Sequence, residues 1–121
     1  MKLSIIIPTY NERNTIESLL NLIEEEKTLQ KQIIIVDDNS NDGSSEIITN
    51  FKFKSEYTYI KHEKNCGKGA CIKSAKKFIT GDIVIIQDAD LEYNPKEYKK
   101  LIQPIIKNLT KVVYGSRVLN K

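Results

Sequence analysis

Two aspartates separated by one small residue are the strongest candidates for chemistry in this sequence. Asp88, Ala89 and Asp90 follow a run of β-branched residues, Ile83 to Ile86, which predicts a strand buried on both faces. Because successive side chains of an extended segment alternate between faces, we expect Asp88 and Asp90 to leave on the same side. Two carboxylates held close together favour a hard divalent cation between them, such as Mg²⁺ or Mn²⁺. Taken alone, the pair could instead be a solvated turn.

Polar residues follow each of the other predicted strands as well. In an open α/β sheet, ligands bind beyond the carboxyl ends of the strands. Several such clusters at one edge therefore predict one shared site, although a solvated loop would explain any single cluster. Besides Asp88 to Asp90, the clusters are Tyr10-Asn11-Glu12, Asp37-Asp38, Asn65 to Lys68, and Arg117.

The residue types in these clusters suggest a phosphorylated ligand. A cation on the aspartate pair could bridge phosphate oxygens, while Lys68 and Arg117 neutralise the remaining charge, the arginine through a bidentate fork. Glu12 and Asp38 are acceptors suited to base amides or ribose hydroxyls, and Tyr10 offers a ring against which a base can lie.

The turn Gly67-Lys68-Gly69 is weaker evidence, because glycines that ease a turn into a helix would explain it equally well. It lacks the spacing of a phosphate-binding Walker loop, and no Gly-x-Gly-x-x-Gly follows the first predicted strand. Cys66 and Cys71 lack Cys-x-x-Cys spacing and nearby partners for zinc, so we expect reduced thiols, one of them on a helix. His62, the only histidine, is expected to be a surface residue near a strand end.

The elements that must position these residues alternate regularly between strand and helix. This alternation predicts parallel βαβ units with right-handed crossovers, in one α/β domain over residues 1–121. Pro8 is expected to stop the first strand, and Asn14 to cap the helix that follows. The predicted strands are 3–8, 33–36, 57–62, 83–86 and 112–114, with Gly115-Ser116-Arg117 trailing out of the last. The predicted helices begin near Asn14, Asp42, Gly67 and Asn94, and the fourth has a stripe of Tyr98, Leu101, Ile102 and Ile105 and a kink at Pro104.

Composition restricts the possible functions less than the motifs do. The 121 residues are 40% hydrophobic and 29% charged, with a net charge of +3. This mild charge does not indicate nucleic-acid binding, although it would suit phosphorylated ligands or an anionic membrane surface. The sequence shows no apolar window long enough to span a membrane and no signal peptide, so we expect a cytoplasmic protein.

Five blocks of this sequence resemble the family 2 glycosyltransferases of the GT-A fold, a three-layer α/β/α architecture with a mostly parallel sheet. The closest branch resembles the polyprenyl- or dolichyl-phosphate mannosyl- and glucosyltransferases. The blocks occur in the family's order over nearly the whole chain: Ser4 to Glu12, Val36 to Ser40 with Asp42 to Ser44, Asn65 to Gly69, Asp88 to Pro95, and Tyr114 to Arg117.

The resemblance implies transfer of a sugar from a nucleotide diphosphate, such as a UDP- or GDP-sugar, with inversion at the anomeric carbon. Asp88 and Asp90 would be the catalytic Asp-x-Asp pair that binds Mg²⁺ or Mn²⁺, and Ala89 would contact the nucleotide sugar through its backbone. Glu92 stands where relatives often carry glutamine as a further metal ligand, and Arg117 matches an arginine that contacts the diphosphate. The residues implied around the base and ribose are Pro8, Tyr10, Glu12, Val36 and Asp38.

The resemblance implies that this chain corresponds to the N-terminal, donor-binding half of such an enzyme, and in the family the other half supplies the acceptor pocket. A polyprenyl phosphate at the inner face of the membrane is the expected acceptor, and self-association through an uncovered sheet edge is a further expectation. A nucleotide-sugar-binding module without turnover is the main alternative. A nucleotidyltransferase fits less well, because those enzymes carry a glycine-rich loop where this chain has Pro8 to Glu12.

Overall fold

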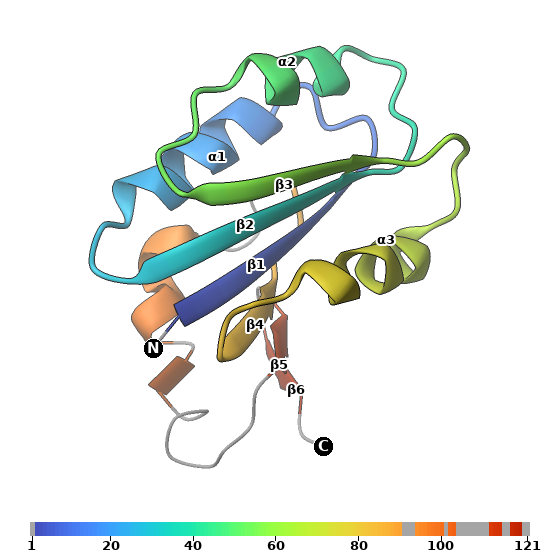
Figure 1. Cartoon of the computed structure of the whole chain (residues 1–121). Helices are drawn as coiled ribbons and strands as arrows, with labels where there is room; N and C mark the ends of the chain where they lie inside the picture. Colours follow the sequence, from blue (N-terminus) through green and yellow to red (C-terminus); the bar gives the residue numbers. More distant parts are fainter. Residues whose placement is uncertain (1, 91–93, 101, 104–111, 115–116, 120–121) are drawn as a thin grey trace.

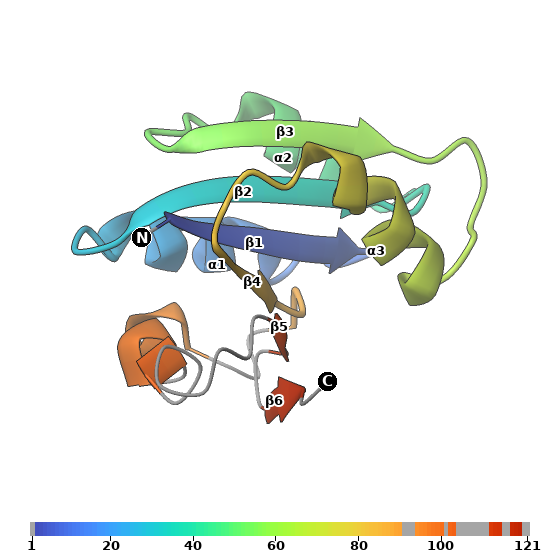
Figure 2. The ribbon, with the colours of Figure 1, turned by 60° about the horizontal axis from the view of Figure 1, so that its bottom comes forward.

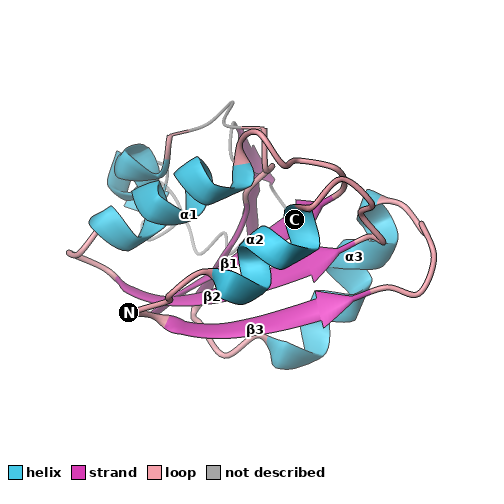
Figure 3. Ribbon diagram, turned by 90° about the horizontal axis from the view of Figure 1, so that it is seen from above, coloured by secondary structure: helices cyan, strands magenta, loops and turns pink. Residues whose placement is uncertain are grey.

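A single twisted sheet forms the centre of the molecule. The computed structural model describes residues 2–90, 94–100, 102–103, 112–114 and 117–119, and within these the strands follow the order β3-β2-β1-β4-β5-β6. All neighbouring strands are parallel except β5 and β6, so the predicted mostly parallel sheet is confirmed. β2 and β3 point the same way side by side in Figure 3. The strands are β1 Lys2–Thr9, β2 Gln30–Asp37, β3 Glu56–Lys61, β4 Ile83–Ile86, β5 Val112–Tyr114 and β6 Arg117–Leu119.

Helices cover both faces of this sheet. The helices α1 (Ile16–Glu25) and α2 (Ser44–Asn50) pack on one face, and α3 (Lys68–Ala75) packs on the other, as Figures 1 and 2 show. Short 3₁₀ turns follow at η1 (Lys76–Phe78) and η2 (Pro95–Glu97). The predicted three-layer α/β/α arrangement is therefore present.

The continuous apolar runs of the strands reflect burial on both faces. On β1, Ile5 and Ile7 face α1 and α2, whereas Ile6 faces α3. The equivalent alternation on β2 sends Ile33 and Ile35 to one core and Ile34 to the other. Such strands read as uninterrupted β-branched residues because neither face meets water.

Pro8 does not end β1, contrary to our expectation, because the strand continues to Thr9 and remains paired with β2. The carbonyl of Ile6 accepts the amide of Gln87 at 2.8 Å, so it points toward the β4 side. Because the N–H and C=O of one strand residue point the same way, the amides of the even-numbered residues of β1 also face β4. The pairing with β4 ends at Ile6, so by residue 8 no ladder requires an amide hydrogen on that side.

Two other local predictions also need correction. The residue that caps α1 is Thr15 rather than Asn14, and the cap has no side-chain hydrogen bond. Instead, the carbonyl of Glu12 accepts the amides of Thr15 and Ile16, at 3.1 and 2.9 Å. Arg117 does not trail out of the sheet, because it begins β6 and pairs with Tyr114 of β5.

The segment after β4 begins as the sequence predicts. The side chain of Asn94 accepts the amide of Lys96 at 2.9 Å, and Pro95 lies in the first turn. Of the predicted stripe, Tyr98 and Ile102 are buried against α1 and the sheet, while Leu101, Ile105 and Pro104 lie outside the described residues. No helix among the described residues has both the length and the apolar character needed to cross a membrane.

One glycine is required by the close approach of two chain segments. Gly81 lies before β4, and its amide donates to the hydroxyl of Ser4 at 2.8 Å. A Cβ atom at this position would come within 2.7 Å of the Ser4 backbone nitrogen and 2.9 Å of the Lys2 carbonyl oxygen. The absence of a side chain at residue 81 therefore allows β4 to enter the sheet beside β1.

Candidate active site

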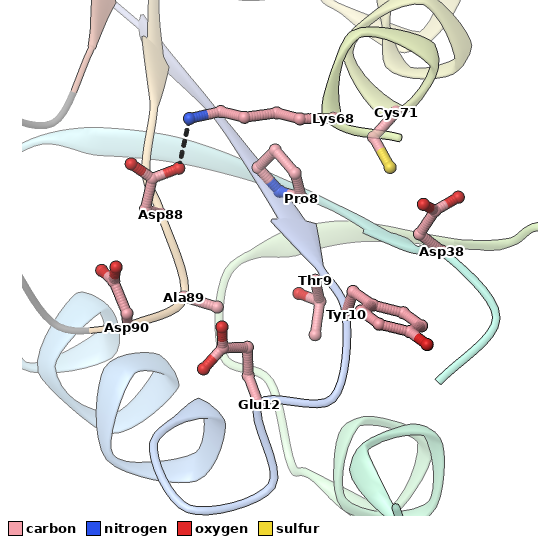
Figure 4. A pocket seen from close by; sticks show the side chains of 10 residues that line it. All are labelled: Pro8, Thr9, Tyr10, Glu12, Asp38, Lys68, Cys71, Asp88, Ala89 and Asp90. Carbon is pink, nitrogen blue, oxygen red and sulfur yellow. Dashed lines mark hydrogen bonds and ion pairs between the residues drawn. The ribbon is translucent and has the colours of Figure 1, made fainter. Parts of the chain in front are cut away.

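A pocket opens at the edge of the sheet where the parallel strands β1, β2 and β4 reach their carboxyl ends. Most of the predicted site residues line it, and they come from the end of β1, from the loops after these three strands and from the first turns of α3 (Figure 4). This convergence is the property predicted for the polar clusters. The lining residues are Pro8, Thr9, Tyr10, Glu12, Asp38, Lys68, Cys71, Asp88, Ala89 and Asp90.

Asp88 and Asp90 lie along one wall of this pocket, and Ala89 between them is buried. Asp90 is exposed, and the side chain of Asp88 is 40% exposed. The ammonium of Lys68 forms an ion pair with Asp88 Oδ1 at 2.5 Å (Figure 4). Two carboxylates thus face one hollow that solvent can reach, and a cationic group already binds one of them.

The loop that carries these carboxylates is anchored at both ends. Gln87 is fully buried, and its side-chain oxygen accepts the Tyr98 hydroxyl at 2.8 Å. On the far side, the hydroxyl of Thr15 donates to the Ala89 carbonyl at 2.5 Å. The sheet, the segment that carries Tyr98 and the start of α1 therefore hold the acidic loop in place.

Asp38 lies across the pocket from the acidic pair. Its Oδ1 accepts the Cys66 amide at 2.9 Å and lies 2.7 Å from His62 Nδ1, and its Oδ2 accepts the Gly67 amide at 2.7 Å. Burial alone would raise the pKa of Asp38, but the hydrogen bonds from His62, Cys66 and Gly67 outweigh it and hold that pKa below its usual value. The carboxylate is therefore a fixed anion at this end of the pocket.

The adjacent acid, Asp37, has a structural role instead. It is fully buried and accepts the Ser40 amide at 2.9 Å and the Tyr59 hydroxyl at 3.1 Å, together with the Ser45 hydroxyl. These bonds tie the end of β2 to the following loop, to α2 and to β3. Asp38, the first residue after β2, lines the pocket instead.

His62 is not the surface residue that the sequence suggested. Its side chain is 13% exposed, with Nδ1 facing Asp38 and Nε2 lying 2.8 Å from the Ser74 hydroxyl. The position of His62 directly after β3, at the edge that carries the other clusters, was the signal that could have identified it.

The two cysteines are free thiols, as predicted, with Cys66 exposed and Cys71 buried on α3. The expectation that no metal-ligating partner lies nearby is wrong for Cys71. One ligand atom from each of Asp38, His62 and Cys71 lies within 4.8 Å of the others. The sequence hides this proximity because the fold brings the three residues together from separate elements.

Of the remaining predicted site residues, only Val36 has a side chain that the structure describes. The side chain of Val36 is fully buried in the core between the sheet and α3, so it supports the pocket from below rather than lining it. Arg117 is placed as the first residue of β6. Glu92 lies outside the described residues.

Comparison with known proteins agrees with this geometry. Residues 4–121 match the model of the family described as "Glycosyl transferase family 2". A dolichol-phosphate mannosyltransferase of Pyrococcus furiosus is 36% identical over 97% of this chain and 33% of its own length.

Two solved structures share the fold. Residues 1–349 of S. aureus TarS in complex with UDP-GlcNAc superpose with a TM-score of 0.76, at 29% identity over 88% of this chain and 32% of that one. The mannosyltransferase PcManGT from Pyrobaculum calidifontis, in complex with GDP-Man and Mn²⁺, gives a TM-score of 0.71 at 28% identity, over 78% and 29% of the two chains. The chain thus has the GT-A fold and spans about a third of the length of these proteins. With a family model that covers nearly all of its residues, this chain belongs to glycosyl transferase family 2.

Proposed function

We propose that this chain binds a nucleotide diphosphate sugar together with Mg²⁺ or Mn²⁺, and that it serves transfer of the sugar to an acceptor. The observation that carries the proposal is that one pocket is lined both by the Asp88–Asp90 pair and by Asp38. The aspartate pair can hold the cation that a diphosphate needs, and Asp38 can accept a hydrogen bond from a nucleoside. The relatives support the proposal, since one is in complex with UDP-GlcNAc and another with GDP-Man and Mn²⁺.

The acidic pair fits a divalent cation. Both carboxylates reach the pocket, and the ion pair from Lys68 to Asp88 shows that this wall binds positive charge. Carboxylate oxygens are the ligands that Mg²⁺ and Mn²⁺ prefer, and such ions usually keep water or phosphate as their remaining ligands. When bound, the cation would supply Lewis-acid stabilisation of the negative charge that develops on the departing diphosphate.

The opposite end of the pocket suits the nucleoside. Asp38 is held as an anion and can accept a hydrogen bond from a base amide or a ribose hydroxyl. Tyr10 is 47% exposed, so its ring is available for a base to lie against. Glu12, on the loop after β1, lies beside Ala89 rather than at this end, and it adds a further acceptor to the lining of the pocket (Figure 4).

The acceptor that suits these residues is a lipid phosphate, in line with the dolichol-phosphate mannosyltransferase among the relatives. A phosphate is already ionised near neutral pH, so it can attack the anomeric carbon without a protein base. A sugar hydroxyl would need a general base within hydrogen-bond reach. Attack from the face opposite the diphosphate would invert the anomeric configuration.

Calorimetric titration with UDP- and GDP-sugars, in Mn²⁺ and in chelator, tests donor binding. We expect binding only with metal, and we expect Asp90→Ala to abolish the metal dependence. Asp82→Ala is the matched control, because Asp82 is an exposed aspartate at the opposite end of β4. Equal affinity in Mn²⁺ and in chelator would contradict the proposal.

Turnover needs a separate measurement. Transfer of radiolabelled sugar to a polyprenyl phosphate, or hydrolysis of the donor, distinguishes an enzyme from a module that only binds. Metal-dependent donor binding with neither reaction would identify this chain as the binding module.

A further inference from the structure

A second group of metal-ligating side chains lies beside the nucleoside end of the pocket, away from Asp88 and Asp90. It comprises Asp38 from the loop after β2, His62 from the position directly after β3, and Cys71 from α3. One ligand atom from each residue lies within 4.8 Å of the others. Figure 4 shows the sulfur of Cys71 and the carboxylate of Asp38 facing one another. Both residues also line the pocket, so an ion could enter from solvent.

The surroundings of these three residues resemble those of a metal site. A histidine that binds a metal through one ring nitrogen usually donates its other N–H to an oxygen acceptor. Ser74 provides that acceptor, because its hydroxyl lies 2.8 Å from His62 Nε2. Without an ion, Nδ1–H donates to Asp38 at 2.7 Å. Binding of an ion by Nδ1 would move that proton to Nε2, where the Ser74 hydroxyl can accept it. The amides of Cys66 and Gly67 fix the carboxylate at the same time.

The donor atoms indicate which ion would bind. One oxygen, one nitrogen and one sulfur suit Zn²⁺, whereas Mg²⁺ and Mn²⁺ prefer oxygen alone. With three protein ligands, such an ion would take a water molecule as its fourth ligand. Tetrahedral zinc, with Zn–S and Zn–N bonds of about 2.3 and 2.0 Å, places its ligand atoms about 3.3 to 3.5 Å apart. Ligand atoms as much as 4.8 Å apart would therefore have to approach by about 1.3 Å, and Asp38 Oδ1 and His62 Nδ1, which lie 2.7 Å apart, would have to separate by about 0.6 Å.

Burial and the nearby Asp38 carboxylate raise the pKa of Cys71 to about 12, so the thiol is protonated when no cation is present. Zinc binding would therefore release the thiol proton to solvent. The negative charge of Asp38 that disfavours the thiolate would at the same time attract the incoming cation.

We propose that Asp38, His62 and Cys71 form a second cation site, selective for Zn²⁺ and similar thiophilic ions. One consequence rests on the proposed function. Because Asp38 would serve both the nucleoside and the zinc ion, a bound zinc ion would oppose donor binding.

Cobalt(II) titration of the full, untagged chain tests this site without any nucleotide. Cobalt replaces zinc in such sites, and a thiolate ligand gives a strong ultraviolet charge-transfer band. We expect the wild-type chain to show this band and to lose it when Zn²⁺ is added. Asp90→Ala should keep the band, since the proposed Mg²⁺ or Mn²⁺ site is elsewhere. A failure of donor binding would leave this result unchanged, so the two proposals are tested independently.

Matched cysteine variants locate the ligand. Cys71→Ala should lose the band and weaken Zn²⁺ binding by more than about 100-fold, whereas Cys66→Ala should retain both. Ser74→Ala leaves all three ligands in place and should weaken binding by about 10-fold through the orientation of His62. Circular dichroism in chelator checks that each variant is folded. A band that persists in Cys71→Ala, or that disappears only in Cys66→Ala, would overturn the proposal, as would the absence of the band in the wild-type chain.

Discussion

Replacing Lys68 by methionine separates two roles that this residue would have in the pocket. The ammonium of Lys68 lies 2.5 Å from Asp88 Oδ1. We propose that the same carboxylate also binds the divalent cation. Without nucleotide, the ammonium and the metal compete for Asp88. With nucleotide, the same ammonium would neutralise phosphate charge. Lys68→Met should therefore tighten the binding of Mn²⁺ alone and weaken the binding of UDP or GDP when Mn²⁺ is saturating.

The structure sets the size of each effect. The side chains of Lys68 and Asp88 are 46% and 40% exposed, so solvent screens their interaction. An exposed ion pair contributes about 0.2–1 kcal/mol, which corresponds to a gain in Mn²⁺ affinity of about 1.4- to 5-fold. A hydrogen bond to a charged phosphate contributes about 1.5–3 kcal/mol, so nucleotide affinity should fall by roughly 10- to 150-fold.

Electron paramagnetic resonance of free Mn²⁺ measures the first effect, and calorimetry with UDP or GDP measures the second. Lys73→Met is the matched control, because Lys73 is exposed in the last turn of the same helix and its loss lowers the net charge equally. If Lys68→Met binds Mn²⁺ more weakly than wild type, or only as tightly as Lys73→Met does, the competition at Asp88 is refuted.

Three further predictions concern stability. Gly81→Ala should lower the free energy of unfolding by about 1–3 kcal/mol, because the new Cβ would meet the Ser4 backbone nitrogen at 2.7 Å; an unchanged urea midpoint would show that β4 can shift freely. Tyr98→Phe removes the hydrogen bond to the buried Gln87 and should reduce the free energy of unfolding by about 1–3 kcal/mol in the same assay, whereas wild-type stability would exclude this anchor. The lowered pKa of Asp38 stabilises the fold fully above the unfolded value of about 3.9, and this contribution is lost as the pH falls through the folded pKa. In Asp38→Asn, the free energy of unfolding should therefore fall less steeply than in the wild-type chain as the pH is lowered. An equally steep fall in the variant would contradict the lowered pKa of Asp38.

The strands could be predicted from the sequence because burial on both faces leaves a strong signal. The runs at Ile5 to Ile7 and Ile33 to Val36 have no other simple explanation, and both lie in central strands. Strand ends were less predictable. Pro8 would interrupt the sheet only if β4 still paired with β1 at residue 8 and required an amide hydrogen from it. The length of β4, which the sequence around Pro8 does not reveal, decides this.

The prediction of the candidate site used one rule, namely that parallel strands bring their carboxyl ends to one edge of the sheet. That rule placed Asp38, Lys68 and Asp88 around a shared pocket. It could not show that Val36 faces the core, because the face of a residue depends on register. His62 also escaped, because its contacts with Asp38 and Ser74 need the packing of α3 against the sheet.

The glycine-rich turn before α3, which was ambiguous in the sequence, connects the two ends of the pocket. The amides of Cys66 and Gly67 bind Asp38 at the nucleoside end, and the next side chain, Lys68, reaches Asp88 at the acidic end. Gly67 has a φ of +93°, a conformation that a residue with a side chain adopts only with strain. The turn therefore acts through its backbone amides at the nucleoside end and through the Lys68 side chain at the acidic end. A displacement of these three residues would disturb both ends at once, so nucleoside and cation binding should be coupled through the first turn of α3.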